Sequence, residues 1–367
     1  MSKLILVSLT LIWCLGVAVH GFTYDEKEIK TEQGKLAMFE RWRSHHKMEK
    51  ISEKEKTVQY NNFKATLEHV HNTNKANKSF KLEMNRFAGM NKAEFKSKFT
   101  GLRAAPPRIR PGKKMAIDHG GPFRYANFTN IPPSIDWRAL GAVTPVKNQD
   151  QCASCYSFAA VDAVEGMHFI RNKELIALST KEIVDCAQYD PPMGCVGGFV
   201  TVSFEYIEKN GGLTTEKNYP YKPQVDPCNV KKEHDIAVQV GGHEIAPMND
   251  EALTKALANQ PVAASIKMED DFMFYKEGVL SSPCGTAIDH AVLLVGYDTA
   301  PDGTKYWIGK NSWGDTWGEK GYFKILRGVP EPEGYCGINI YICYPTPDKT
   351  TTPHIDNEPM VHLSRDL

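Results

Sequence analysis

The sequence lacks several features that mark common classes of protein. Outside its first 21 residues, none of its 367 residues lies in an apolar run long enough to span a membrane. It contains no fixed-period repeat and no low-complexity tract, which argues against a solenoid or a fibrous array. Its formal net charge is zero, so the chain as a whole has no excess of either sign.

The one long apolar run stands at the N-terminus. Residues 1–21 combine a single lysine, an apolar stretch from Leu4 to Val19 and small residues at Val19 and Gly21. This pattern predicts a secretory signal peptide that is cleaved near Gly21. A membrane anchor would need a longer run and a stop-transfer flank, so no anchor is expected. The chain is therefore expected to enter the secretory pathway, where disulfides persist.

The zero net charge hides an asymmetry between two parts of the chain. Residues 22–130 contain 23 Lys and Arg against 12 Asp and Glu, whereas residues 131–367 contain 20 against 32. A basic part can indicate nucleic-acid binding, but the signal peptide argues against that partner. The opposite charges of the two parts indicate that residues 22–130 lie on residues 131–367, with contacts that weaken when carboxylates take up protons.

The cysteines leave several kinds of site open. Loss of Cys14 with the signal peptide leaves eight: Cys152, Cys155, Cys186, Cys195, Cys228, Cys284, Cys336 and Cys343. Parity alone permits four bridges and no reactive thiol. The spacing of Cys152 and Cys155 also suits half of a zinc site, but no second pair of that spacing and no nearby histidine pair exists. A thioredoxin-type couple would need a βαβ context, which is absent.

Helical periodicity dominates the first part of the chain. Residues 22–100 are expected to be helical because apolar residues recur at helical spacing, at Leu36, Phe39 and Trp42 and again at Tyr60, Phe63, Leu67 and Val70. Residues 104–123 are rich in Pro, Gly and Arg without apolar periodicity. That composition predicts an exposed, cleavable linker.

A helical stretch and then several strands are expected beyond the linker. A helix should run from Ser154 to about Arg171, and short β-rich runs at 261–268, 291–297, 305–313 and 321–328 lie between turn residues. A helical half thus precedes a β half. This order predicts an α+β protein with a cleft where the halves meet.

Cys155 is the best candidate for a nucleophile. It lies near the predicted start of a helix, where the helix dipole favours a thiolate. A base must accompany it, and His290 alone among the later histidines opens a buried-looking strand. Asn311 ends the neighbouring strand, beside Trp313 and Trp317, which could keep water from an imidazole–amide hydrogen bond.

These residues match a known pattern. "CASCY" at 152–156, followed by His290 and Asn311, resembles the papain-type signature. Residues 135–149, 178–186 and 310–325, "IDWRALGAVTPVKNQ", "LSTKEIVDC" and "KNSWGDTWGEKGYFKI", also match. From about residue 30 to 345 the chain resembles a papain-family cysteine endopeptidase. The resemblance implies the papain-like two-lobed fold, with a helical left lobe, a β-barrel-like right lobe and the active site in the cleft.

The resemblance also implies roles for individual residues. Cys155 would attack, His290 would move the proton, Asn311 would orient the imidazole and Gln149 would help the Cys155 N–H bind the oxyanion. The implied bridges are Cys152–Cys195, Cys186–Cys228 and Cys284–Cys336, which leaves Cys343 as a small core residue. The implied substrate-binding residues are Gly197, Gly198, Phe199, Val200, Ser265, Ile288, Asp289 and Tyr341. Tyr341 either shortens the S2 pocket or turns away into the core. No metal and no cofactor are implied.

The family pattern divides the chain into a signal peptide (1–21), an inhibitory propeptide (22–130), a peptidase domain (131–345) and a C-terminal tail (346–367). The implied partners are protein and peptide substrates, the chain's own propeptide and cystatin-type inhibitors, and the enzyme is expected to be a monomer. Asn77 and Asn127 begin candidate glycosylation motifs.

The C-terminal sequence bears on the compartment. Ser364-Arg365-Asp366-Leu367 approximates the Lys-Asp-Glu-Leu address of the KDEL-tailed plant cysteine endopeptidases. The compartment is then a vacuole, a lysosome-like or endoplasmic-reticulum-derived body, or the extracellular space, according to whether the tail is read or trimmed.

Asp150, Ala153 and Tyr156 depart from the family, which has glycine at the first two positions and usually Trp at the third. These departures leave a second hypothesis open, in which the chain is a catalytically weakened storage or binding protein.

Overall fold

The computed structural model describes residues 21–103, 123–187 and 192–347. Most of the predicted signal peptide and of the Pro-rich linker, and nearly all of the predicted tail, lie outside these residues. Nowhere in the described ranges is a helix both long and apolar enough to cross a membrane.

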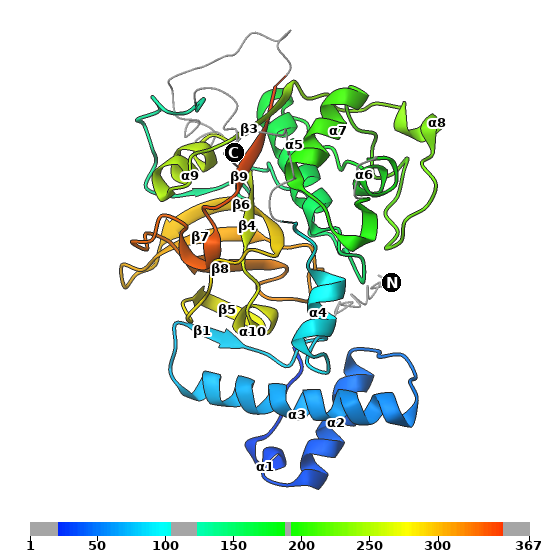
Figure 1. Cartoon of the computed structure of the whole chain (residues 1–367). Helices are drawn as coiled ribbons and strands as arrows, with labels where there is room; N and C mark the ends of the chain where they lie inside the picture. The colour runs from blue at the N-terminus through cyan, green and yellow to red at the C-terminus, as the bar shows by residue number, and fades with distance from the viewer. Residues whose placement is uncertain (1–20, 104–122, 188–191, 348–367) are drawn as a thin grey trace, which may run out of the picture.

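The N-terminal segment, residues 22–103 and 123–130, contains helices α1 (Glu26–Ile29), α2 (Glu32–His45), α3 (Glu53–Lys75) and α4 (Lys92–Phe99), and strand β1 (Phe80–Leu82). Side-chain caps start these helices. Ser52 begins α3 in a capping box with Glu55, and Asn91 accepts a hydrogen bond from the backbone N–H of Glu94 at the start of α4. Figure 1 shows α1–α3 together beside one end of the molecule, with α4 leading away from them.

Apolar faces hold α2 and α3 together. Phe39, Trp42, Phe63 and Leu67 have no exposed surface, and the rings of Phe39 and Phe63 lie 5.3 Å apart. The helical periodicity predicted helices through these residues, and α2 and α3 confirm them. Leu36 also lies in α2, but its side chain is 46% exposed.

A helical lobe follows the segment and contains α5 (Cys155–Asn172), α6 (Thr180–Cys186), α7 (Val200–Asn210) and α8 (Val230–Glu233). Helix α5 is buried along almost its whole length from Cys155 to Met167. It packs against α6 and α7 on one side and against strand β6 on the other, so its first residue lies at the junction of the two lobes (Figure 1).

The second lobe is a sheet with two further helices. Its elements are β2 (Ile135–Asp136), β3 (Gly242–Ile245), α9 (Asp250–Leu257), β4 (Val262–Ile266), α10 (Asp270–Met273), β5 (Tyr275–Leu280), β6 (His290–Thr299), β7 (Lys305–Lys310), β8 (Tyr322–Leu326) and β9 (Ile342–Thr346). The strand order is β1-β5-β8-β7-β6-β4-β9-β3, and β2 pairs with β6. Short 3₁₀ turns occupy Gly194–Val196 and Tyr335–Gly337.

The sheet positions two polar residues. His290 is the first residue of β6, and Asn311 directly follows β7, which pairs antiparallel with β6. The N-terminal segment extends the same sheet, because β1 pairs antiparallel with β5. This strand interrupts the helical run expected for residues 22–100, because Phe80 and Leu82 are buried against the sheet rather than on a helix face.

Candidate active site

Cys155 begins α5 and is fully buried. The side chain of Ser154 does not cap the helix, so the first backbone N–H groups of α5 lack partners within the helix. Backbone groups of Ala291 and Tyr156, and of Gly101 from the N-terminal segment, face the thiol and act to lower its pKa. Burial nevertheless dominates these favourable contacts and raises the pKa of Cys155 to about 12. The thiol is therefore protonated in this form.

His290 begins β6, and its chain neighbour Ala291 faces the Cys155 thiol. The Nε2 atom of His290 lies 2.9 Å from Oδ1 of Asn311, and Nδ1 has no hydrogen-bond partner among the residues that the structure describes. Burial lowers the pKa of His290 to about 4, although the bond to Asn311 acts in the opposite direction. Thiol and imidazole are thus both neutral near neutral pH.

Two tryptophans cover the imidazole and its amide partner. The ring of Trp313 lies 4.9 Å from that of His290 between centroids, and Trp317 packs edge-on against Trp313 at 5.1 Å. Both indoles are buried. They exclude water from the His290–Asn311 hydrogen bond, which fixes the ring with Nδ1 free to exchange a proton.

Hydrogen bonds to its side-chain amide and to its backbone fix the position of Gln149. Its side-chain Nε2 donates to the Cys152 carbonyl at 2.8 Å, and its side-chain Oε1 accepts from Ser312 Oγ at 2.6 Å. Its backbone carbonyl accepts from the Tyr221 hydroxyl at 2.9 Å. A side-chain amide has two N–H groups, and only one of them is used here. The second is available next to the N-terminus of α5.

The N-terminal segment occupies the space in front of Cys155. Phe99 accepts a hydrogen bond from Trp313 Nε1 at 3.1 Å. Gly101 and Leu102 donate to the Asp289 carbonyl, and the Gly101 carbonyl accepts from the Gly198 N–H at 2.8 Å. The segment therefore runs from Trp313, over the thiol, to Gly198, and bonds both lobes. A peptide cannot reach Cys155 while it is in place.

Comparison with known proteins decides the family. A model of the papain family cysteine proteases matches residues 131–346, and one of the cathepsin propeptide inhibitor domain matches residues 39–95. The chain belongs to the papain family. It is a cysteine endopeptidase that carries a propeptide inhibitor domain, and the N-terminal segment is called the propeptide below.

Relatives and solved structures agree with this assignment. Vignain of Phaseolus vulgaris is 46% identical over 354 residues, which cover 96% of each chain. A KDEL-tailed cysteine endopeptidase of Arabidopsis thaliana is 45% identical over 358 residues, covering 96% of this chain and 97% of that one. The proform of the ragweed pollen cysteine protease Amb a 11 superposes with a TM-score of 0.82 at 38% identity, covering 91% of this chain and all of that one.

The three departures from the family have identifiable surroundings. Asp150 has a φ of 47°, in the left-handed region that favours glycine, so its side chain costs on the order of 1 kcal/mol. Ala153 is not in that region. Its methyl and carbonyl instead pack against Gly101 of the propeptide. The Tyr156 hydroxyl donates to the Gly194 carbonyl at 3.0 Å, beside the backbone of Gly198.

The predicted substrate-binding residues lie at the junction of the lobes. Gly197 has a φ of 96°, and a side chain there would collide with the Gly101 carbonyl, so glycine permits a close backbone approach. The Tyr341 hydroxyl donates to Oγ1 of Thr201 on α7 at 2.6 Å. The side chains of Phe199, Val200 and Ser265 are buried, Ile288 packs against the core, and the Asp289 carboxylate pairs with Lys267 at 2.7 Å and with propeptide Lys96 at 2.9 Å.

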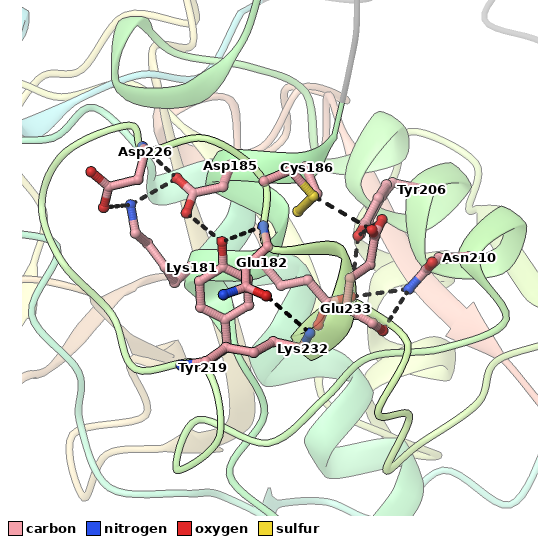
Figure 2. The surroundings of a disulfide bond; sticks show 12 residues. Lys181, Glu182, Asp185, Cys186, Tyr206, Asn210, Tyr219, Asp226, Lys232 and Glu233 are labelled. Carbon is pink, nitrogen blue, oxygen red and sulfur yellow. Dashed lines mark hydrogen bonds and ion pairs between the residues drawn. A yellow bond between two sulfur atoms is a disulfide. The ribbon is translucent and has the colours of Figure 1, made fainter.

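The structure contains the disulfides Cys152–Cys195, Cys186–Cys228 and Cys284–Cys336, with Cys155 and Cys343 free and buried. Figure 2 shows the polar surroundings of Cys186. Lys181 lies between Asp185 and Asp226, at 2.7 and 2.9 Å, and the Tyr206 hydroxyl bonds both Glu182 and Glu233. Glu233 also lies near both sulfurs of the bridge. This group is not a thiolate metal site, because the two sulfurs are bonded to each other.

A buried ionic network connects the lobes next to the candidate catalytic residues. Lys147 pairs with Asp162 and Glu165 of α5 at 2.8 and 2.6 Å, and Lys310 pairs with Asp162 at 2.9 Å. Lys310 directly precedes Asn311, and Lys147 lies two residues before Gln149. The network therefore ties both polar catalytic candidates to the helix that begins with Cys155.

Several residues at this junction were not identified from the sequence. They are Arg86, Lys96 and Gly101 in the propeptide, Thr201 opposite Tyr341, and the buried lysines Lys147 and Lys310. The basic excess of residues 22–130 signalled cationic contacts in general. Nothing in the sequence signalled which lysine or arginine would contact which carboxylate.

Proposed function

We propose that Cys155, His290, Asn311 and Gln149 hydrolyse peptide bonds once the propeptide has left. His290 Nδ1 takes the thiol proton, and the thiolate attacks the substrate carbonyl carbon. The Cys155 N–H and the unused N–H of Gln149 Nε2 donate to the oxyanion. His290 then protonates the leaving amine, and water hydrolyses the thioester. The observation that supports this proposal best is the buried His290–Asn311 bond beside a thiol at a helix N-terminus.

Removal of the propeptide should also change the ionisation of the pair. Burial is the largest cause of the raised pKa of Cys155 and of the lowered pKa of His290. Solvent access relieves both effects, and each charge then stabilises the other. The thiolate–imidazolium pair is accordingly a property of the mature enzyme, and the precursor is inactive both sterically and electrostatically.

We further propose that the boundaries of the precursor lie near residues 21, 130 and 345, and that the enzyme works as a monomer inside the secretory pathway or outside the cell. The exposed Asn77 and Asn127 are then glycosylation sites. Cystatin-type inhibitors would occupy the place that residues 99–103 take here. Tyr341, bonded to Thr201, would close the S2 pocket and favour short apolar side chains.

Substitution of Cys155 tests the catalytic assignment. Cys155→Ala should abolish peptide hydrolysis and leave the fold intact, because the thiol forms the bond to substrate and alanine removes only one buried sulfur atom. Cys343→Ala is the matched control, since it removes the other free, buried thiol. Peptidase activity above a few per cent in clean Cys155→Ala protein would rule out this nucleophile.

A further inference from the structure

Propeptide residue Arg86 inserts between two loops of the peptidase domain. Its Nη2 donates to Oδ1 of Asn148 at 3.0 Å and to the Trp313 carbonyl at 3.2 Å. Its Nη1 lies 3.8 Å from Oδ1 of Asp150. The guanidinium also lies over the ring of Phe87, 4.9 Å from the centroid. The peptidase domain thus offers a cation one carboxylate and two neutral oxygen acceptors.

These acceptors belong to the peptidase domain and are held by contacts within it. Asn148 and Trp313 pair through their backbones. Asn148 Nδ2 donates to Asp150 Oδ1 at 2.6 Å, and the Asp150 N–H donates back to Asn148 Oδ1 at 3.2 Å. Asp150 has a left-handed backbone where it forms these two hydrogen bonds with Asn148. Both bonds lie within the peptidase domain and do not involve the propeptide. The acceptor group therefore persists after activation.

The acceptor group lies on a definite side of the thiol. Propeptide residues pass from Phe99, bonded to Trp313, over Cys155 at Gly101, to Gly198. Trp313 packs on His290, which protonates the leaving amine in the proposed function. The leaving-group half of the site is consequently the half that contains Trp313, Asn148 and Asp150.

We propose that in the mature enzyme Asp150, Asn148 and the Trp313 carbonyl form a subsite for an arginine or lysine side chain of the substrate, on the leaving-group side of the cleaved bond. Arg86 occupies this subsite in the precursor. Arginine suits it better than lysine, because a planar guanidinium can donate to several acceptors at once. The inference rests on the proposed function, because it assigns the leaving group by the role of His290.

Mature enzyme and internally quenched peptides test the subsite. The peptides share one sequence before the cleaved bond and carry Arg, Lys, Gln or Glu at each of the first three positions after it. At the position that reaches the subsite, kcat/KM for Arg should exceed that for Gln about five- to tenfold. The Asp150 side chain is 50% exposed even in the precursor, so solvent limits the effect. Added salt should reduce the ratio.

Two variants identify the residue responsible. Asp150→Asn and Asp150→Gly should both bring the Arg-to-Gln ratio close to one, and the glycine variant also relieves the left-handed backbone, which protects against misfolding. Asp302→Asn is the matched control, because Asp302 lies in the turn between β6 and β7, at the end of β6 opposite His290. It should retain the full ratio.

The outcomes separate the subsite from the proposed function. Failure to hydrolyse any of the peptides would contradict the proposed function and the subsite together. Hydrolysis with the same kcat/KM whichever residue follows the cleaved bond would overturn the subsite alone. A ratio that survives in both Asp150 variants would likewise overturn it, as would an effect of these variants confined to propeptide binding.

Discussion

Gly101 of the propeptide lies against the Cys155 thiol, and its lack of a side chain is what permits this position. A Cβ atom added at Gly101 would stand 2.0 Å from the Ala153 carbonyl oxygen and 2.8 Å from the Ala153 Cβ. The nearer of these contacts is to backbone, which cannot move away as a flexible side chain could. Gly101→Ala should therefore lift residues 101–103 away from Cys155.

The hydrogen bonds at Gly101 set the size of the effect. Displacement would break the bond from the Gly198 N–H, at 2.8 Å, and the bonds from Gly101 and Leu102 to the Asp289 carbonyl, at 3.2 and 3.1 Å. A hydrogen bond contributes about 0.5–1.5 kcal/mol net, so the loss of two or three amounts to about 1–4 kcal/mol. The inhibition constant of the free propeptide should rise about 5- to 700-fold.

Inhibition of the mature enzyme by added propeptide measures this change. Ala93→Ser, on the exposed surface of α4, is the matched control and should inhibit like the unmodified propeptide. Ala153→Gly in the enzyme should not restore inhibition by Gly101→Ala, because the closer contact is to the carbonyl oxygen, which remains. An unchanged inhibition constant for Gly101→Ala would refute the placement of this segment over the thiol.

Three further predictions concern substrate choice, pH and stability. In a peptide library, Val or Leu should be preferred over Phe two residues before the cleaved bond by about 10- to 200-fold in kcat/KM, and Tyr341→Ala should reduce that preference. Better cleavage of peptides with Phe at this position by the unmodified enzyme would contradict a pocket shortened by Tyr341. Inhibition by the propeptide should weaken as pH falls below about 4. Burial opposes ionisation of Asp271, but the hydrogen bond to His69 of the propeptide outweighs burial and lowers the pKa of Asp271. The contribution of Asp271 to propeptide affinity is therefore present above the ordinary pKa of an aspartate, and it is lost when acid protonates the carboxylate. Glu83 acts in the opposite sense, because burial raises its pKa to about 7 in the complex and its contribution to affinity is lost as pH rises. Glu83→Gln should consequently tighten inhibition about tenfold at pH 7 and little at pH 4, and equal effects at both pH values would contradict this assignment. Lys310→Met should lower the free energy of unfolding by about 3 kcal/mol in urea denaturation, because it removes a cation that pairs with a buried carboxylate. Substitution of the exposed Lys305 by Met is the control, and an equal loss of stability in both variants would exclude a special role for the buried ionic network.

Local sequence patterns predicted much of the fold. The apolar spacing that predicted a helix from Ser154 to about Arg171 matches α5 within a residue at each end, and each of the β-rich runs overlaps a strand. Strand β1 was missed, because three residues form it only by pairing with β5, nearly two hundred positions later. Tertiary pairing of this kind leaves no periodicity in a short segment.

The site divides in the same way. The residue types of Cys155, His290 and Asn311 and their places at element ends singled them out; the structure joins His290 to Asn311 by a hydrogen bond, and their roles in catalysis stay a prediction. Contacts of Arg86 with Asn148, and of Tyr341 with Thr201, depend on how the propeptide and the two lobes meet. Such pairings are set by the assembled fold rather than by neighbouring residues, so the sequence indicated at most the sign of the charges involved.

Covalent labelling of Cys155 tests the central claim most directly. The bromelain protease of Ananas comosus has been solved in complex with the E64 inhibitor; it is 40% identical and covers 59% of this chain, with a TM-score of 0.57. We expect E64 at pH 5–6 to leave the precursor unmodified, because residues 99–103 bury the thiol. After removal of the propeptide it should modify Cys155 alone, one label per chain, with peptidase activity lost in proportion. Labelling at Cys343, or full activity in enzyme labelled at Cys155, would contradict the account.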